Sequence, residues 1–198
     1  MPQKKVVLCE GIREAILVSV ILDQNKRKNK IIPHEEFQIP GESPENDRIK
    51  WQATESIKIH EFLGRKGQFY SFLRKDEGGD TKCIDAFVIL YMDKDERFEF
   101  VVLVDSPALE YLKGRARKVL SRDILDKVSN NFYLTKDKTK HHIFFTPNSL
   151  ESQIRHFTGK NIDYMNRKEA RRVLRDFKII CERKKIEWFL ELEKALLS

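Results

Sequence analysis

The sequence predicts a single α/β domain covering residues 1–198, with a central, mainly parallel sheet, flanking helices and a long C-terminal amphipathic helix. Three observations support this fold class. Short continuous apolar runs, typical of buried strands, alternate with segments whose apolar residues recur at helical spacing. The composition, 40% hydrophobic and 35% charged, is that of a globular chain. We find no internal repeat or low-complexity tract, so one domain with a sheet that allows some antiparallel pairing is the simplest description.

The N-terminal segment predicts a strand, a tight turn and a helix. Residues 6–9 are all apolar and are followed directly by Glu10 and Gly11, so the strand ends at a carboxylate. From Ile12 to Ile21 the apolar residues recur at helical spacing, which predicts a well-buried helix.

A change in composition follows this helix. Residues 31–50 contain three prolines and several acidic residues, which predicts a surface insertion with little regular structure.

The centre of the chain contains two continuous apolar runs, residues 84–92 and residues 98–104, separated by charged residues 93–97. We expect them to form adjacent buried strands. Ser106 and Pro107 then predict the start of a helix that reaches Leu120, because proline is well tolerated in a first helical turn.

The last third of the chain predicts two short strands and two helices. Residues 132–134 and 142–145 are the candidate strands. Asn148, with Glu151 three positions later, matches a capping box that opens a helix. Residues 167–197 carry apolar residues at helical spacing and predict the long C-terminal helix, with at most one break.

The charge and the cysteine content limit the functions that the chain can have. With 38 Lys and Arg against 31 Asp and Glu, the formal net charge is +7 and the pI is about 9.2, which favours a polyanionic partner such as DNA or RNA. Cys9, Cys83 and Cys181 show no paired spacing, so we expect reduced core thiols and a cytoplasmic protein. No apolar run approaches the roughly 20 residues of a membrane span, so no membrane partner is expected. The oligomeric state stays open.

Carboxylates at strand ends are the candidate catalytic groups. Glu10 follows the first apolar run, and Asp93 and Asp95 follow the run at residues 84–92. If the two strands are neighbours, these side chains meet. Carboxylate oxygens are suitable ligands for Mg²⁺, or for Mn²⁺, and Mg²⁺ in enzymes commonly holds phosphates. The sequence therefore predicts a metal-dependent nuclease that hydrolyses DNA or RNA phosphodiesters.

These motifs resemble those of the Toprim domain of topoisomerases, bacterial primases and OLD-type nucleases. The family's first motif is a hydrophobic strand ending in Glu-Gly, similar to residues 6–11, and its second is an Asp-x-Asp after another hydrophobic strand, similar to residues 88–95. Residues 143–151 resemble a strand-to-helix segment with a downstream glutamate in some nuclease-type members. The resemblance implies Glu10 as metal ligand or general acid/base, Asp93 and Asp95 as metal ligands, and Glu151 as an additional ligand.

Other interpretations of the same acids stay open. Asp93 and Asp95 also fit a solvated hairpin turn, and Glu151 fits the capping partner of Asn148. The order of elements also resembles restriction-endonuclease-like nucleases, with Asp85 as the first acid and Glu99 or Asp105 as the second, although the expected lysine does not follow either one. A third alternative is a non-catalytic nucleic-acid-binding or interaction protein.

Basic residues concentrate on two predicted helices, where they would form faces that contact phosphates. Tyr133, Phe157 or Tyr164 would be available for base stacking. The basic faces also fit solvated helix surfaces, and the three aromatic residues also fit the core. No phosphate-binding loop, nucleophile elbow or dinucleotide fingerprint occurs, which argues against an ATPase, an α/β-hydrolase or a dinucleotide enzyme. The candidate phosphate contacts are Lys113, Arg115, Arg117, Lys118, Arg171, Arg172 and Arg175.

Overall fold

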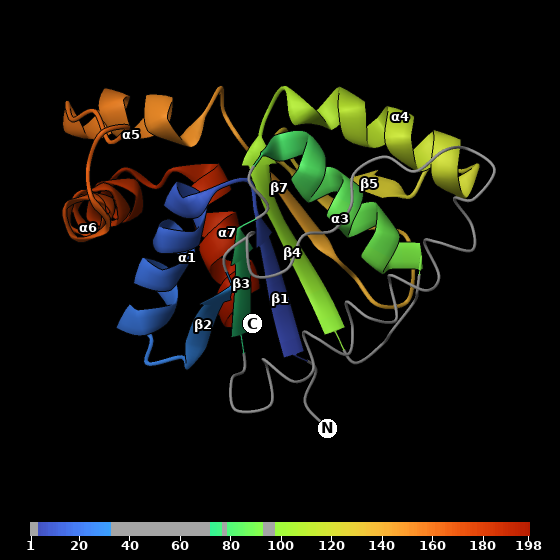
Figure 1. The fold of residues 1–198 in the computed structure, drawn as a ribbon, viewed down its shortest axis with the longest axis horizontal. Coiled ribbons are helices and arrows are strands. Elements are labelled where there is room, and N and C mark those ends of the chain that lie inside the picture. The colour runs from blue at the N-terminus through green and yellow to red at the C-terminus, as the bar shows by residue number, and fades with distance from the viewer. Residues whose placement is uncertain (1–3, 33–71, 77–78, 93–97) are drawn as a thin grey trace.

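A computed structural model describes residues 4–32, 72–76, 79–92 and 98–198, and in these residues one sheet lies between two layers of helices (Figure 1). The strands are β1 (Lys4–Cys9), β2 (Asn29–Ile32), β3 (Phe72–Asp76), β4 (Phe98–Asp105), β5 (Leu125–Lys127), β6 (Phe132–Thr135) and β7 (His142–Thr146). The helices are α1 (Ile12–Gln24), α3 (Asp80–Met92), α4 (Ala108–Leu120), α5 (Leu150–Thr158), α6 (Arg167–Lys184) and α7 (Glu187–Leu197).

The sheet has the order β2-β3-β1-β4-β7-β6-β5 within the described residues. The strands from β2 to β7 in this order are parallel, and β6 and β5 complete the sheet with antiparallel pairings. The predicted α/β class with a mainly parallel, mixed sheet is therefore confirmed.

Both faces of the central strands are buried, which explains their continuous apolar sequences. In β1, Val6 and Leu8 face a core shared with α3 and α4, whereas Val7 and Cys9 face a core shared with α1, α5, α6 and α7. Figure 1 shows these two helical layers on opposite faces of the sheet. The buried side chains thus define a three-layer α/β/α arrangement.

The prediction of a strand at residues 84–92 is wrong, because these residues belong to α3. The helix begins at Asp80, and its residues from Cys83 to Tyr91 are all buried, between the sheet and α4. A helix that is covered all round loses its polar face, so its sequence is as continuously apolar as that of a buried strand.

The C-terminal region contains two helices where one long helix was predicted. Lys185 adopts a left-handed backbone conformation with a φ of 55°, which ends α6 before α7 begins at Glu187. The break allowed by the sequence is therefore present, and α7 folds back so that it packs beside β7.

The predicted capping box at Asn148 is also wrong in detail. The N-cap of α5 is Ser149, whose side chain accepts a hydrogen bond from the backbone N–H of Ser152, and Asn148 has a positive φ of 62°. The helix itself is present as predicted.

Several other predictions are confirmed. The first strand and helix correspond to β1 and α1, the run at residues 98–104 lies in β4, and the two short C-terminal strands correspond to β6 and β7. The three cysteines are buried thiols. Most of the predicted insertion at residues 31–50 lies outside the described residues.

Candidate functional site

Glu10 lies at the carboxyl end of β1, where backbone contacts fix its position. Its N–H donates to the carbonyl of Leu103 in β4 at 3.1 Å, and its carbonyl accepts from the N–H of Gly79, just before α3, at 2.7 Å. Its side-chain Oε2 accepts a hydrogen bond from the backbone N–H of Asp105 at 3.0 Å. Glu10 therefore faces the end of the neighbouring parallel strand, β4. The acid that it meets there is Asp105, whereas the sequence suggested Asp93 and Asp95.

Asp105 is the last residue of β4, and its carboxylate is also held in place. Its Oδ1 accepts from the backbone N–H of Leu150 at 3.1 Å, in the first turn of α5, and from the hydroxyl of Thr146. Within the described residues, no hydrogen bond is made by Oε1 of Glu10 or Oδ2 of Asp105. As far as the described residues are concerned, one oxygen of each carboxylate is thus left for a ligand.

This pair lies where the chain connections change direction. After β1 the chain passes through α1 to β2 at one side of the sheet, and after β4 it passes through α4 to β5 at the other side. The helices α1 and α4 pack on opposite faces (Figure 1). In open α/β sheets, ligands bind in the crevice outside the carboxyl ends of strands at such a switch point.

Burial and neighbouring acids favour protonation of Glu10 and Asp105. Burial, together with the charge of Asp105 and smaller contributions from Asp80 and Glu151, raises the pKa of Glu10 to about 7 despite the hydrogen bond from Asp105. Burial likewise raises the pKa of Asp105, with Glu151 and Asp80 adding to the shift. A cation placed between these carboxylates would relieve the repulsion.

Glu14 is a member of this cluster that the sequence analysis missed. It occupies the first turn of α1, four residues after Glu10, and is only 4% exposed. Burial raises its pKa to about 8, and the nearby acids Glu151, Glu10 and Asp105 contribute. At neutral pH this carboxyl group holds its proton, so it adds no full negative charge to the edge.

Gly11 gives the Glu14 carboxyl group its space. A Cβ at this position would lie 3.3 Å from Oε2 of Glu14, a tight contact. The Glu-Gly pair therefore serves two purposes. Glu10 supplies the carboxylate, and Gly11 leaves room for the buried carboxyl group of Glu14.

The donor set suits a magnesium ion that is only partly coordinated by protein. Among the described residues, no group of three or more His, Cys, Asp or Glu side chains could hold a metal ion. Mg²⁺ is commonly bound through one or two carboxylates, with waters and substrate phosphates completing its octahedron. Glu10 and Asp105 match that requirement, and the N-termini of α1 and α5, which begin beside them, favour phosphate groups.

The other predicted metal ligands are Asp93, Asp95 and Glu151. Asp93 and Asp95 lie outside the described residues, and the element that precedes them is α3 rather than the strand that the Toprim-like motif requires. Glu151 lies in the first turn of α5 and is close enough to raise the pKa of Glu10, Glu14 and Asp105.

The acids of the restriction-endonuclease-like alternative are not brought together in that pattern. Asp85 lies on a helix, where its Oδ1 is 2.7 Å from Nε of Arg115 and 3.1 Å from the hydroxyl of Tyr111. Glu99 and Asp105 lie at opposite ends of β4. The required pair of acids on adjacent strands is therefore not formed by Asp85 with either of them.

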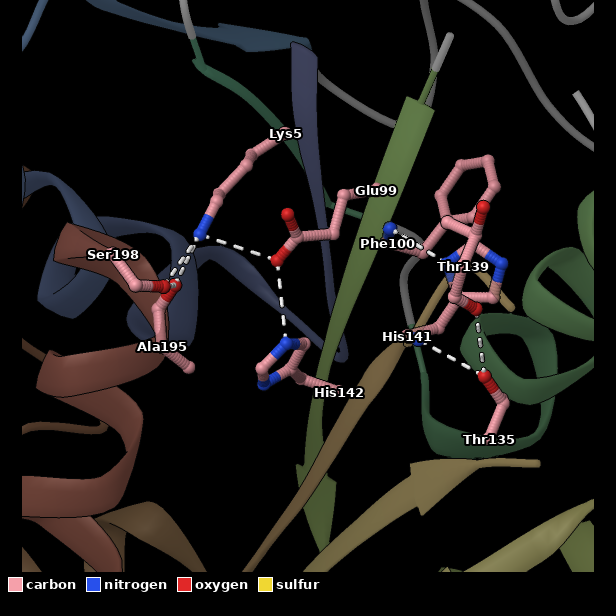
Figure 2. A network of polar contacts seen from close by, with 9 residues as sticks. All are labelled: Lys5, Glu99, Phe100, Thr135, Thr139, His141, His142, Ala195 and Ser198. Atoms are coloured by element: carbon pink, nitrogen blue, oxygen red, sulfur yellow. Dashed lines mark hydrogen bonds and ion pairs between the residues drawn. The ribbon is translucent and has the colours of Figure 1, made fainter. Parts of the chain in front are cut away.

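Glu99 instead belongs to a polar network at the amino edge of the sheet (Figure 2). Its Oε1 lies 3.2 Å from Nζ of Lys5 and 3.3 Å from Nε2 of His142. Lys5 also donates to the carbonyl of Ala195 and, at 3.1 Å, to the hydroxyl of Ser198, which ties β1 to the end of the chain.

The two adjacent histidines at this edge point in opposite directions, as expected on a strand (Figure 2). Nδ1 of His141 accepts from the backbone N–H of Phe100 at 3.1 Å. Burial lowers the pKa of both His141 and His142 to about 4, so both are neutral at pH 7. His141 is buried and His142 is partly buried, and both act as packed polar residues.

The basic face predicted on α4 is only partly available to a ligand. Arg115 is 8% exposed and forms a salt bridge with Asp85, so it is not part of an exposed basic face. Lys113 pairs with Glu110 at 2.8 Å, whereas Arg117 and Lys118 are exposed.

A shallow cavity of about 340 Å³ borders this helix. Its charges are nearly balanced and do not select an anion, and its lining consists of Glu110, Lys113, Arg117, Asp123, Leu125, Lys127 and Tyr133.

The basic face predicted on α6 is also smaller than expected. Arg171 donates to the hydroxyl of Ser19 at 2.9 Å and pairs with Asp23, both on α1. Arg172 and Arg175 are exposed and lie one turn apart. These two are the members of the predicted α6 set that remain available for phosphate contacts.

Comparison of the chain with protein-family models, with curated proteins and with solved structures found no match. None of the helices in the described residues is long and apolar enough to cross a bilayer.

Proposed function

We propose that this protein is a Mg²⁺-dependent nuclease whose metal ligands are Glu10 and Asp105 at the carboxyl edge of the sheet. The observation that carries the proposal is the hydrogen bond from the backbone N–H of Asp105 to the carboxylate of Glu10 at the switch point, in an environment that raises the pKa of both side chains. Acids kept under such repulsion at a strand edge are candidates for cation binding, because functional sites commonly perturb pKa values in this way.

The proposal keeps the Toprim-like design but replaces its second motif. β4 is a hydrophobic strand that ends in Asp105 and lies beside β1, which is the relation that the family's second motif has to its first. The residues after Asp105 are Ser106 and Pro107, so the motif would hold one acid here where the family has two. Mn²⁺ has similar ligand preferences and is expected to substitute.

Each side chain then has a defined part in phosphodiester hydrolysis. Bound Mg²⁺ would orient the scissile phosphate, stabilise its developing charge and lower the pKa of a water. Glu10 and Asp105 would hold the metal through their carboxylates. Thr146 and the N–H of Leu150 orient Asp105, and the buried carboxyl group of Glu14 holds its proton at neutral pH.

The test is cleavage of labelled single- and double-stranded DNA and RNA with Mg²⁺, with Mn²⁺ and in EDTA. Wild-type protein should cleave at least one substrate only with metal, and Glu10→Gln and Asp105→Asn should each abolish cleavage while the fold is retained. Asp93→Asn and Asp95→Asn serve as matched variants at the alternative acids. Loss of cleavage in those two, with full activity of Asp105→Asn, would move the site to Asp93 and Asp95.

A second candidate is a nucleic-acid-binding protein whose acid pair binds Mg²⁺ without hydrolysis. It is favoured by the small donor set, since the described residues place the carboxylate of Glu10 against the backbone of Asp105 and contain no group of three or more His, Cys, Asp or Glu that could hold a metal ion. Metal-dependent binding by the wild type, without cleavage of any of the four substrates, would select this candidate.

A further inference from the structure

Tyr164 is the most exposed large apolar side chain in the described residues, and it lies in the connection between α5 and α6. It is 94% exposed, whereas the next such residue, Val128, is 51% exposed. A single exposed aromatic side chain is ordinary on its own. Its surroundings are what suggest a ligand.

The turn that carries Tyr164 is rigid. Ile162 is fully buried, and Met165 packs against the same core, so both ends of the turn are anchored. The N–H of Met165 donates to the carbonyl of Ile162 at 3.1 Å, and the N–H of Asp163 donates to the side chain of Asn161 at 3.0 Å. The ring is therefore held out into solvent by a fixed backbone, so a ligand that contacts it would order little additional chain.

The same turn is tied to the edge that carries the acid pair. Nη2 of Arg13, in the first turn of α1, donates to the carbonyl of Asp163 at 3.0 Å. Arg13 is three residues after Glu10. Tyr164 thus lies next to the segment that leads directly out of the candidate site.

The segment around the ring carries a small excess of positive charge. Between residues 159 and 169 there are three cations, Lys160, Arg167 and Lys168, and two anions, Asp163 and Glu169. Lys160 pairs with Asp176 of α6 at 3.6 Å, whereas Arg167 and Lys168 make no salt bridge within the described residues. All three cations are exposed. An exposed aromatic ring among cations is the usual composition of a surface that binds single-stranded nucleic acid, because bases stack on the ring while cations contact phosphates.

We propose that Tyr164 is a stacking platform for an unpaired base of a single-stranded nucleic acid, whose strand continues toward Glu10 and Asp105. The inference rests on the proposed function for its direction, since it identifies the substrate as a single strand. A paired base has both faces covered by its neighbours in the duplex, so the ring would discriminate against double-stranded substrates.

The test is binding of a fluorescently labelled oligonucleotide of about 12 nucleotides, which is within the usual site size of such surfaces, to the full chain in EDTA. Tyr164→Ala should weaken binding roughly 5- to 150-fold, the range seen when a stacking aromatic is removed. Tyr164→Phe should bind like the wild type because it keeps the ring. Val128→Ala, a matched loss of an exposed apolar side chain, should have no effect.

Two further measurements separate stacking from other causes. An abasic oligonucleotide should bind wild type and Tyr164→Ala equally, and 2-aminopurine in the strand should be quenched by wild type and not by Tyr164→Ala. The slope of log affinity against log salt should be the same for both proteins, because the ring neutralises no phosphate.

The inference is overturned if Tyr164→Ala binds the oligonucleotide as the wild type does, or if its defect is equally large on the abasic strand. Tyr164-dependent binding to phosphatidylserine vesicles, without an effect on oligonucleotides, would assign the ring to a membrane surface instead. Binding in EDTA does not require the metal site. Absence of cleavage would therefore count against the proposed nuclease alone, and unchanged binding by Tyr164→Ala would count against stacking alone.

Discussion

The amino and carboxyl ends of the parallel strands each hold a partly buried carboxylate, but the neighbours of these two carboxylates differ in charge. At the amino edge, Glu99 lies beside the ammonium group of Lys5 and the imidazole of His142 (Figure 2). At the carboxyl edge, Glu10 lies beside Asp105, and the described residues contain no salt bridge to either acid. One edge supplies its own cation and the other concentrates negative charge.

This difference separates a structural from a functional arrangement of similar groups. A buried carboxylate beside a lysine is satisfied within the folded chain and requires nothing from outside. A carboxylate whose pKa is raised by burial and by a neighbouring acid, like that of Glu10, gains stability when it binds a proton or a metal ion. The comparison therefore predicts that removing charge destabilises the amino edge and stabilises the carboxyl edge.

The largest expected effect is at the amino edge. Lys5→Met should lower the free energy of unfolding by about 3–5 kcal/mol, because it leaves Glu99 without its cation inside the protein. Denaturant unfolding at pH 7 measures this change. The double variant Lys5→Met/Glu99→Gln should recover part of the loss, because no unpaired charge remains. A cost below about 1 kcal/mol, as for a surface pair, would remove the contrast between the edges.

At the carboxyl edge, Glu14→Gln should raise stability at alkaline pH. The folded-state pKa of Glu14, about 8, is above its ordinary value of 4.5, so its stabilising contribution is complete below pH 4.5 and is lost as pH rises through 8. At pH 9 the variant should be more stable than wild type by about 1–3 kcal/mol, since one unit of pKa shift corresponds to about 1.4 kcal/mol and the amide remains buried. At pH 4 the two should differ little.

Unfolding by urea at pH 4, 7 and 9 measures this profile. Glu187→Gln is the matched control, because Glu187 is an exposed glutamate in the first turn of α7. For the two histidines at the amino edge, the dependence of stability on pH has the opposite sign. Their folded-state pKa is lowered from 6.5 to about 4, so their contribution is complete above pH 6.5 and is lost as pH falls through 4. An alkaline limb that is the same in Glu14→Gln and wild type would contradict the assignment.

A smaller effect is expected from Mg²⁺ itself. At ten times its dissociation constant, an ion that binds only the folded state stabilises it by about 1.4 kcal/mol, which corresponds to a rise in Tm of about 3–6 °C for a chain of this size. Thermal unfolding at pH 8 with and without Mg²⁺ measures the shift. Glu10→Gln should lose it, whereas Glu99→Gln should keep it. An equal shift in both variants would place the ion elsewhere.

The sequence prediction and the proposed site share Glu10 and differ in its partner. Glu10 is conspicuous in the sequence because a short apolar run, an acid and a glycine are all adjacent in the chain. The sequence points to Asp93 and Asp95 as its partners because residues 84–92 are as continuously apolar as a buried strand. Periodicity cannot separate a buried helix from a buried strand when every position is covered, and the covering by the sheet and α4 is a property of the fold.

Other features depended on contacts between distant parts of the chain. Glu14 looked like an ordinary acid in a first helical turn, and only packing reveals that it is buried under the site. Arg115 and Arg171 looked like members of basic faces, but each meets an aspartate from another helix, Asp85 and Asp23 respectively. A helical pattern gives the side of the helix on which a residue lies and not what covers that side.

The smallest expected effect concerns the cations on α6, and it tests whether exposure distinguishes binding residues from structural ones. Each phosphate contact removed should reduce the slope of log affinity against log salt by about 0.7–0.9. Arg172→Ala and Arg175→Ala should each reduce it by that amount for nucleic acids of all sequences, because both side chains are exposed. Salt titrations of oligonucleotide binding measure the slopes.

Arg171→Ala is the matched control on the same helix. Its guanidinium is already paired with Asp23 and hydrogen-bonded to Ser19, so its removal should leave the salt slope unchanged. The same variant should lower the free energy of unfolding by about 0.2–1 kcal/mol, the usual value of a partly exposed pair. If instead Arg171→Ala changes the slope and the other two variants do not, the nucleic acid lies against α1 and the exposed side of α6 is only a solvated surface. That result would also mean that the nucleic acid does not contact Arg172 or Arg175. Tyr164 and its neighbouring cations would then be the contact to test first.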